Sequence, residues 1–228
     1  MTKKLHHIRT TDERRADSLR LLVHDLKNPL TVIRINAEMV RDQILDPSVR
    51  QDVIDIVEAA DLADALIDGM QAYLKLERDG EDFTWFPMDA VEVLRHAVDR
   101  PALRRHVRLD LPREIQMSGD RMALEGAFTD MLVNARRLAE EGRVSVRTDE
   151  HEEDDVVIRI HHPGAAIPES LRPRFFELYG ALELHQSGIS GAAAGLVYAR
   201  MVIDQHGGKL DFEDGVDGST DLVVRLPR

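Results

Sequence analysis

Apolar residues recur at alternating steps of three and four in two long stretches near the start of the chain. In the first stretch they are Leu19, Val23, Leu26, Leu30, Ile33, Ala37, Val40 and Ile44, and in the second Val49, Val53, Ile56, Ala60, Ala63, Ile67, Met70 and Leu74. This spacing predicts two long helices with one apolar seam each. The pair Asp46-Pro47 between them is typical of a helix start. We therefore expect an antiparallel helical hairpin over residues 1–78.

The apolar stripes of this hairpin are wider than one helix pair can cover. Leu22, Val57, Leu62 and Leu66 extend the two seams. Two antiparallel helices bury only part of such a surface against each other. The pattern therefore predicts a homodimer in which two hairpins form a four-helix bundle.

The periodicity changes after a charged segment at residues 78–82, which predicts a linker over residues 79–87. Beyond it, helical and alternating patterns are mixed, so residues 88–228 are expected to form a second domain. Helices are predicted at 88–98, 120–138 and 196–205, with a short one through Phe175-Phe176, and strands at 107–111, 143–148, 156–161, 209–213 and 222–226. This order indicates an α+β fold, a sandwich with helices on one face of a mixed sheet.

Composition narrows the class of protein. The 228 residues are 43% hydrophobic, enough for a real core, and carry a formal charge of −12. This acidity disfavours a nucleic-acid partner, because phosphate binding needs a concentrated basic surface. There is no cysteine, so disulfides and thiolate metal sites are excluded. No apolar stretch approaches the length of a signal peptide core or a membrane span, and we expect a cytoplasmic protein with no membrane partner.

One histidine lies off the apolar seam of the first helix. His24 falls on a polar line with Asn28 and Thr31, at i, i+4 and i+7, so the three side chains should project from one face. Asp25 follows His24, and a carboxylate bonded to one imidazole nitrogen fixes the tautomer and leaves the other nitrogen as a nucleophile. Pro29 should bend the helix beside the histidine. An exposed histidine without a role is the alternative interpretation.

Residues 24–31, His-Asp-Leu-Lys-Asn-Pro-Leu-Thr, resemble the phosphoacceptor box of sensor histidine kinases. The resemblance implies that His24 carries a phosphoryl group and that Asp25 orients and activates its imidazole. It also implies that Asn28 positions water or a partner, and that Lys27 and Thr31 lie at the partner-binding face. The implied partner is the receiver domain of a response regulator.

Residues 88–228 resemble the ATP-binding catalytic domain of histidine kinases, a fold shared with gyrase and Hsp90. In the first nucleotide box the family places two asparagines four residues apart, and this chain has Asp130 and Asn134. Asn134 could hold magnesium through its amide oxygen, and Asp130 could act as a hard oxygen ligand. The Asp130 charge would repel ATP unless a cation lay between them.

The two later nucleotide boxes are more altered. The family aspartate that accepts a hydrogen bond from adenine is replaced by His162, although Gly164 is kept. An imidazole accepts only as the right neutral tautomer, so the resemblance implies that adenine recognition is lost. In the glycine-rich box Gly191 and Gly195 are kept, and Ala193 replaces a glycine where close approach to phosphate is needed. We expect a vestigial nucleotide site.

Other histidines are assigned structural roles. His161 and His162 are adjacent on a predicted strand and should point to opposite faces, so no metal site is predicted there. His206 before Gly207 is interpreted as a helix end with a glycine cap.

Three functions remain open. The first is a dimeric histidine phosphotransferase that relays phosphoryl groups between response-regulator aspartates through His24 and needs no cofactor. The second is an ATP-dependent histidine kinase, which would use Mg and ATP to phosphorylate His24. The third is a non-catalytic scaffold that binds a kinase or a regulator.

Overall fold

The computed structural model describes most of the chain. The described residues are 11–41, 46, 48–57, 83–139, 142–149, 155–164, 166–177, 196–215 and 218–228, with single residues or pairs between 59 and 74 and between 180 and 189. Side chains of the first helix are described from Leu26 onward. Gly191 and Gly195 lie outside the described residues, and so does Ala193.

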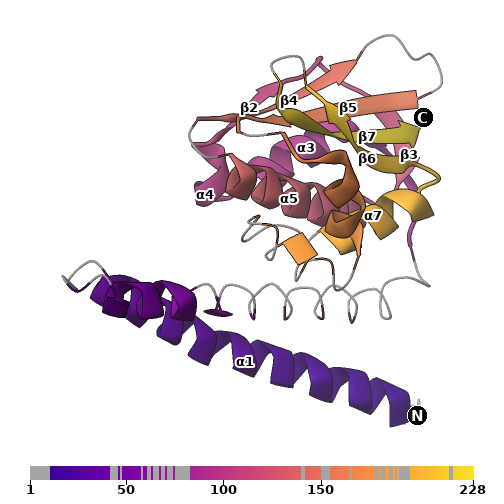
Figure 1. Ribbon diagram of the computed structural model, residues 1–228. Helices are drawn as coiled ribbons and strands as arrows, with labels where there is room; N and C mark the ends of the chain where they lie inside the picture. Colours follow the sequence, from indigo (N-terminus) through magenta and orange to yellow (C-terminus); the bar gives the residue numbers. More distant parts are fainter. Residues whose placement is uncertain are drawn as a thin grey trace, which may run out of the picture.

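The N-terminal part is helical, as predicted. Helix α1 runs from Thr11 to Arg41 with Pro29 inside it (Figure 1). Residues 48–57 form the start of the next helical stretch. The Asp46 carboxylate accepts hydrogen bonds from the Ser48 backbone N–H at 2.9 Å and from the Ser48 hydroxyl at 2.7 Å. Because such bonds satisfy donors at a helix N-terminus, the predicted helix start at Asp46-Pro47 is confirmed.

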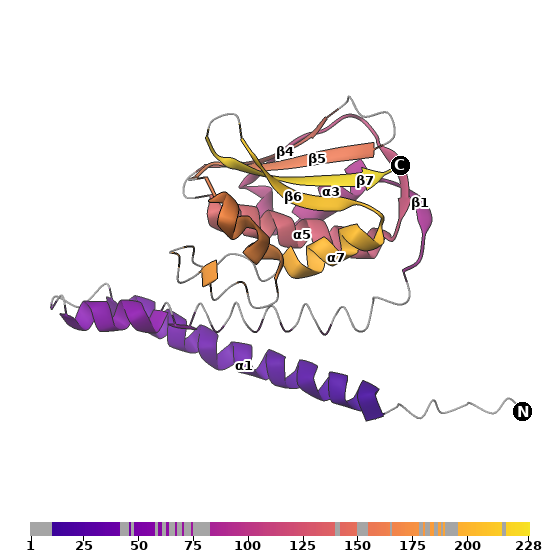
Figure 2. The same cartoon turned by 45° about the vertical axis from the view of Figure 1, so that its right-hand side comes forward.

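The C-terminal part is an α+β sandwich, as predicted (Figure 2). Its large sheet has the strand order β2-β4-β5-β7-β6. The strands are β2 (Val107–Asp110), β4 (Val144–Asp149), β5 (Asp155–His162), β6 (Lys209–Asp214) and β7 (Thr220–Pro227). β2 and β4 are parallel and the other neighbours are antiparallel, so the sheet is mixed.

Helices cover one face of this sheet (Figures 1 and 2). They are α3 (Ala90–Val98), α4 (Pro101–Arg104), α5 (Arg121–Leu138) and α7 (Leu196–Gln205), and the 3₁₀ helix η1 (Glu169–Phe176) lies between β5 and α7 in the chain. Alternation along β5 places Val156, Ile158 and Ile160 in the core and turns Arg159 and His161 toward the other face. The core therefore lies between the sheet and the helices.

Two short strands and one short helix were not predicted. β1 (Phe86–Asp89) pairs antiparallel with β3 (Gln116–Gly119), and α4 has four residues. Met88 belongs to β1, so the predicted helix start at residue 88 is wrong. The helix begins at Ala90, because the Asp89 carboxylate accepts from the Val91 N–H and caps it. β1 also begins within the segment predicted as a linker.

Candidate functional site

The predicted phosphoacceptor residues lie in the middle of α1. His24 and Asp25 belong to this helix, and the structure describes their backbone but not their side chains. Asn28, one turn further on, is exposed, and Lys27 is half-buried. The Thr31 hydroxyl donates to the Lys27 carbonyl at 2.9 Å. The hydroxyl proton of Thr31 is therefore donated to the backbone of its own helix. Asn28 is the exposed member of the polar line among the described side chains.

Asp130 and Asn134 share one face of α5. This helix is capped by Asp120, whose carboxylate accepts from the Ala123 N–H at 2.9 Å. Asn134 is 2% exposed, and its amide nitrogen donates to the Asp130 carbonyl at 3.0 Å. The structure therefore brings the two predicted residues together, with the Asn134 amide nitrogen turned toward the helix backbone.

His162 is the last residue of β5 and is 1% exposed. It is paired in register with Thr220 of β7, whose hydroxyl accepts from the Ile167 N–H at 2.8 Å. Gly164 follows with a positive φ of 147°, a conformation that favours glycine. The position that the resemblance assigns to an adenine-binding carboxylate thus holds a buried imidazole. A neutral imidazole offers at most one acceptor, whereas a carboxylate offers two oxygens.

His161 points to the opposite face of the sheet. Its Nδ1 lies 2.9 Å from Oδ1 of Asp221, a carboxylate that is itself buried. The prediction that the two adjacent histidines do not form a metal pair agrees with this geometry. Within the described part of the chain, no group of three or more histidine, aspartate or glutamate side chains could hold a metal ion.

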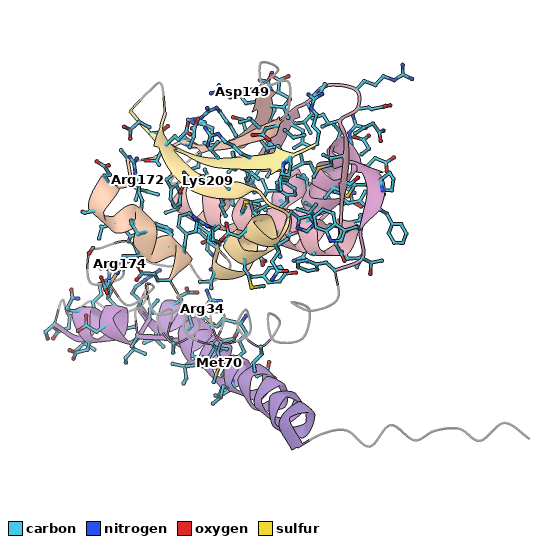
Figure 3. All side chains as sticks on the ribbon, turned by 90° about the vertical axis from the view of Figure 1, so that its right-hand side faces the viewer. Arg34, Met70, Asp149, Arg172, Arg174 and Lys209 are labelled. Atoms are coloured by element: carbon cyan, nitrogen blue, oxygen red, sulfur yellow. The ribbon has the colours of Figure 1, made fainter. Side chains whose placement is uncertain are left out.

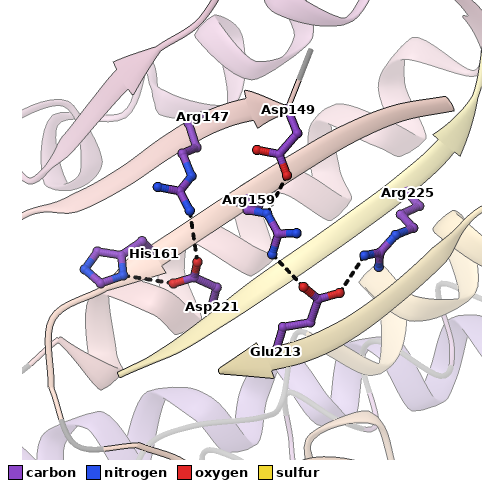
Figure 4. Close-up of polar contacts among 7 residues, drawn as sticks. All are labelled: Arg147, Asp149, Arg159, His161, Glu213, Asp221 and Arg225. Atoms are coloured by element: carbon purple, nitrogen blue, oxygen red, sulfur yellow. Dashed lines mark hydrogen bonds and ion pairs between the residues drawn. The ribbon is translucent and has the colours of Figure 1, made fainter. Parts of the chain in front are cut away.

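A charged network covers this opposite face of the sheet, and the sequence analysis missed it. Figure 4 shows Arg159 between Asp149 and Glu213, at 2.6 Å from each, and Arg225 on the other oxygen of Glu213 at 2.5 Å. Although burial opposes the charged form, the hydrogen bonds to the two carboxylates raise the pKa of Arg159. The alternation of charged residues along β4 and β5 was the available signal. The network links side chains of β4, β5, β6 and β7 across this face.

A cleft of about 550 Å³ lies between η1, α7 and β6. Its charged lining residues include Arg172 and Arg200, and Figure 3 labels Arg172 on η1. Arg172 pairs with Asp214, and Arg200 lies over the Phe176 ring at 5.3 Å from its centroid. Among the described residues, Asp130, Asn134, His162 and Gly164 do not line this cleft.

Comparison with known families supports the architecture. Residues 14–79 match the His Kinase A (phospho-acceptor) domain, and residues 119–228 match the histidine kinase-, DNA gyrase B- and HSP90-like ATPase. The chain is therefore a sensor histidine kinase core, with a phospho-acceptor helical region followed by the ATPase-type sandwich.

Individual relatives agree with this family. The histidine protein kinase SaeS of Staphylococcus aureus is 23% identical over 240 residues, which cover 99% of this chain and 67% of SaeS. The sensor protein VanS of Enterococcus faecium is 26% identical over 235 residues, covering 100% of this chain and 61% of VanS. The chain thus spans about two thirds or less of the length of these relatives.

Among solved structures, full-length ShkA in complex with AMPPNP has a TM-score of 0.59 at 19% identity. The superposed region covers 93% of this chain and 46% of ShkA, and the two proteins share the fold. None of the helices in the described part of our chain combines the length and apolar character needed to cross a membrane.

Proposed function

We propose that this two-component signalling protein is a histidine phosphotransferase, which receives a phosphoryl group on His24 from a response-regulator aspartate and passes it to another. The observation that carries the proposal is the contrast between the two halves of the molecule. The box from His24 to Thr31 retains the residues of a phosphoacceptor. The sandwich holds the buried imidazole of His162 where an adenine acceptor is required.

The transfer needs no nucleotide in this chain. A nitrogen of the His24 imidazole attacks phosphorus, the P–N bond forms, and the bond from phosphorus to the aspartate oxygen of the receiver breaks. A magnesium ion bound by the receiver would supply positive charge beside the leaving carboxylate. Asp25 holds the proton on the other ring nitrogen and stabilises the charge that develops on the imidazole. Passing the group onward reverses these steps, and Asn28 and Lys27 lie one turn along for contact with the receiver.

The exposed apolar seam of α1 supports a dimer. Leu26, Ile33 and Val40 are 52%, 47% and 48% exposed in the single chain, although they occupy the predicted seam. Ile56 and Met70 of the second helical stretch are also exposed. Contiguous apolar surface of this kind indicates an interface, and a second hairpin would complete a four-helix bundle. In that arrangement His24 lies outside the buried seam.

An ATP-dependent kinase is the second candidate, and two observations favour it. Asn134 is retained on α5 next to Asp130, and the relatives in the comparisons carry the names of sensor proteins and histidine kinases. With ATP bound, Asp130 and Asn134 would be the residues to hold magnesium. Both candidates use His24 as the phosphoacceptor and differ in the donor.

Phosphotransfer from receiver domains tests the first proposal. The protein is mixed with a panel of purified receiver domains that have been phosphorylated with labelled acetyl phosphate. We expect label on His24 in the wild type, no label in His24→Gln, and wild-type labelling in His96→Gln, which changes an exposed histidine of α3. If no receiver transfers label while receivers still bind the protein, the relay is refuted and a scaffold role is favoured.

A further inference from the structure

His206 is a buried histidine that the predicted phosphoacceptor chemistry does not use. It follows α7 and is 2% exposed. Its Nδ1 lies 2.7 Å from the Val202 carbonyl, and its Nε2 accepts from the Asp120 backbone N–H at 2.9 Å. A carbonyl can only accept and a backbone N–H can only donate. The ring is therefore the neutral tautomer that is protonated on Nδ1.

The same ring contacts the chain where it arrives from the helical region. The Trp85 ring lies 4.8 Å from the imidazole centroid, and the Phe83 ring lies 5.4 Å from it. Between these aromatic residues, the Thr84 N–H donates to the Asp120 carboxylate at 2.9 Å. Residues 83–85 are thus held by two adjacent groups, the imidazole of His206 and the carboxylate of Asp120.

The contact site formed by His206 and Asp120 for residues 83–85, called the seat below, joins the ends of two helices. Asp120 caps the N-terminus of α5, the helix that carries Asn134, and His206 lies at the C-terminus of α7. Gly119 makes room for the ring, since a Cβ at that position would lie 2.8 Å from Cδ2 of His206. A shift of either helix end would therefore change the surroundings of Trp85. In the same way, movement of residues 83–85 would change the contacts at both helix ends.

We propose that His206 is a positioning residue whose hydrogen bonds and ring contacts fix where the chain from the phosphoacceptor helices joins the sandwich. The seat itself rests on the geometry of the sandwich. Its consequence for phosphotransfer at His24 rests on the proposed function, in which a receiver must reach His24 on the hairpin.

Protonation should loosen this seat. An imidazolium carries N–H groups on both nitrogens, so its Nε2 would face the Asp120 N–H as a second donor. Among the described groups around the ring, Asp120 is the charged one, while α7 contributes a carbonyl and residues 83 and 85 contribute aromatic rings. Burial lowers the pKa of His206, and the Val202 carbonyl and the Asp120 carboxylate oppose that shift without cancelling it.

The protein provides its own reporter, because Trp85 is its single tryptophan. Trp85 emission is followed between pH 8 and pH 5 in the full chain, together with amide hydrogen exchange at Thr84. In the wild type we expect the emission to change with a midpoint below 6.5. His206→Gln keeps an acceptor for the Asp120 N–H without titrating, so its emission should stay constant and Thr84 should stay protected. His206→Phe keeps a ring without the hydrogen bonds, and Thr84 exchange should rise about tenfold.

The control is His96→Gln, which should titrate like the wild type. The proposal is overturned if the emission change persists in His206→Gln, if its midpoint lies at or above 6.5, or if Thr84 exchange in His206→Phe equals that of the wild type. These measurements need no phosphoryl donor, so they stand even if no receiver phosphorylates His24. In the transfer assay, His206→Phe should slow labelling from a receiver and leave direct labelling of His24 by phosphoramidate unchanged. Equal rates of transfer from the receiver to His206→Phe and to the wild type would refute the proposed effect of His206 on phosphotransfer.

Discussion

The Asp120 carboxylate connects two parts of the sandwich, and its substitution tests that connection quantitatively. One carboxylate oxygen accepts from the Ala123 N–H and caps α5, and the other accepts from the Thr84 N–H. Loss of an N-cap costs about 1 kcal/mol, and loss of a hydrogen bond to a charged group costs about 1.5 kcal/mol or more. Asp120→Ala should therefore lower the free energy of unfolding by about 2–3 kcal/mol.

Asp120→Asn separates the two hydrogen bonds. The amide oxygen can still cap α5, whereas the amide nitrogen would meet the Thr84 N–H as a donor. This variant should lose only about 1.5 kcal/mol of unfolding free energy, the share of the Thr84 bond. The assay is urea unfolding of the full chain followed by Trp85 fluorescence, which reports on the sandwich.

Asp110→Ala is the matched control, because Asp110 is an exposed residue at the end of β2. It should change the free energy of unfolding by less than about 0.5 kcal/mol. The reasoning is refuted if Asp120→Ala behaves like this control, or if Asp120→Asn is as destabilised as Asp120→Ala. The second result would mean that the negative charge, and not the set of acceptors, stabilises the seat.

Three further predictions concern other parts of the molecule. Gly208→Ala would place a Cβ 2.3 Å from the Arg225 carbonyl, and we expect Tm to fall by at least about 5 °C in a thermal melt; an unchanged Tm would contradict the contact. Burial opposes ionisation of Glu213, but its bonds to Arg159 and Arg225 lower its pKa from 4.5. The contribution of Glu213 to stability is therefore present above pH 4.5 and is lost as the pH falls through the folded pKa. Glu213→Gln should therefore flatten the loss of stability on acidification in pH-dependent urea titrations, and an unchanged slope would count against it. Ile33→Glu should convert dimer to monomer in light scattering, whereas Asn36→Glu, also on an exposed position of α1, should leave the dimer intact.

The long periodic elements could be predicted from the sequence. The seam of α1, the helix α7 at residues 196–205 and the alternation of β5 each rest on a pattern that one segment contains by itself. β1 and β3 could not be predicted in this way. Each has four residues, and each is a strand only because it pairs with the other, about thirty positions away along the chain. Met88 was assigned to a helix because its own neighbourhood favours one.

The candidate site shows the same division. The roles of Asn134 and His162 follow from their places in motifs, and the structure adds their burial and the Asn134 bond to the Asp130 carbonyl. The seat of His206 on Asp120 joins residues 86 positions apart, and a helix cap was all that its local sequence indicated. Gly207 does adopt a positive φ of 71°, so that cap is confirmed.

The source of the phosphoryl group on His24 is the central claim, and labelling with ATP tests it most directly. One sample of the full chain is incubated with γ-labelled ATP and magnesium. A second, separate sample is incubated with a labelled phosphorylated receiver domain. We predict label on His24 from the receiver and none from ATP, because a buried imidazole replaces the adenine acceptor at His162. Label on His24 from ATP that disappears in Asn134→Ala would contradict the account and establish the kinase.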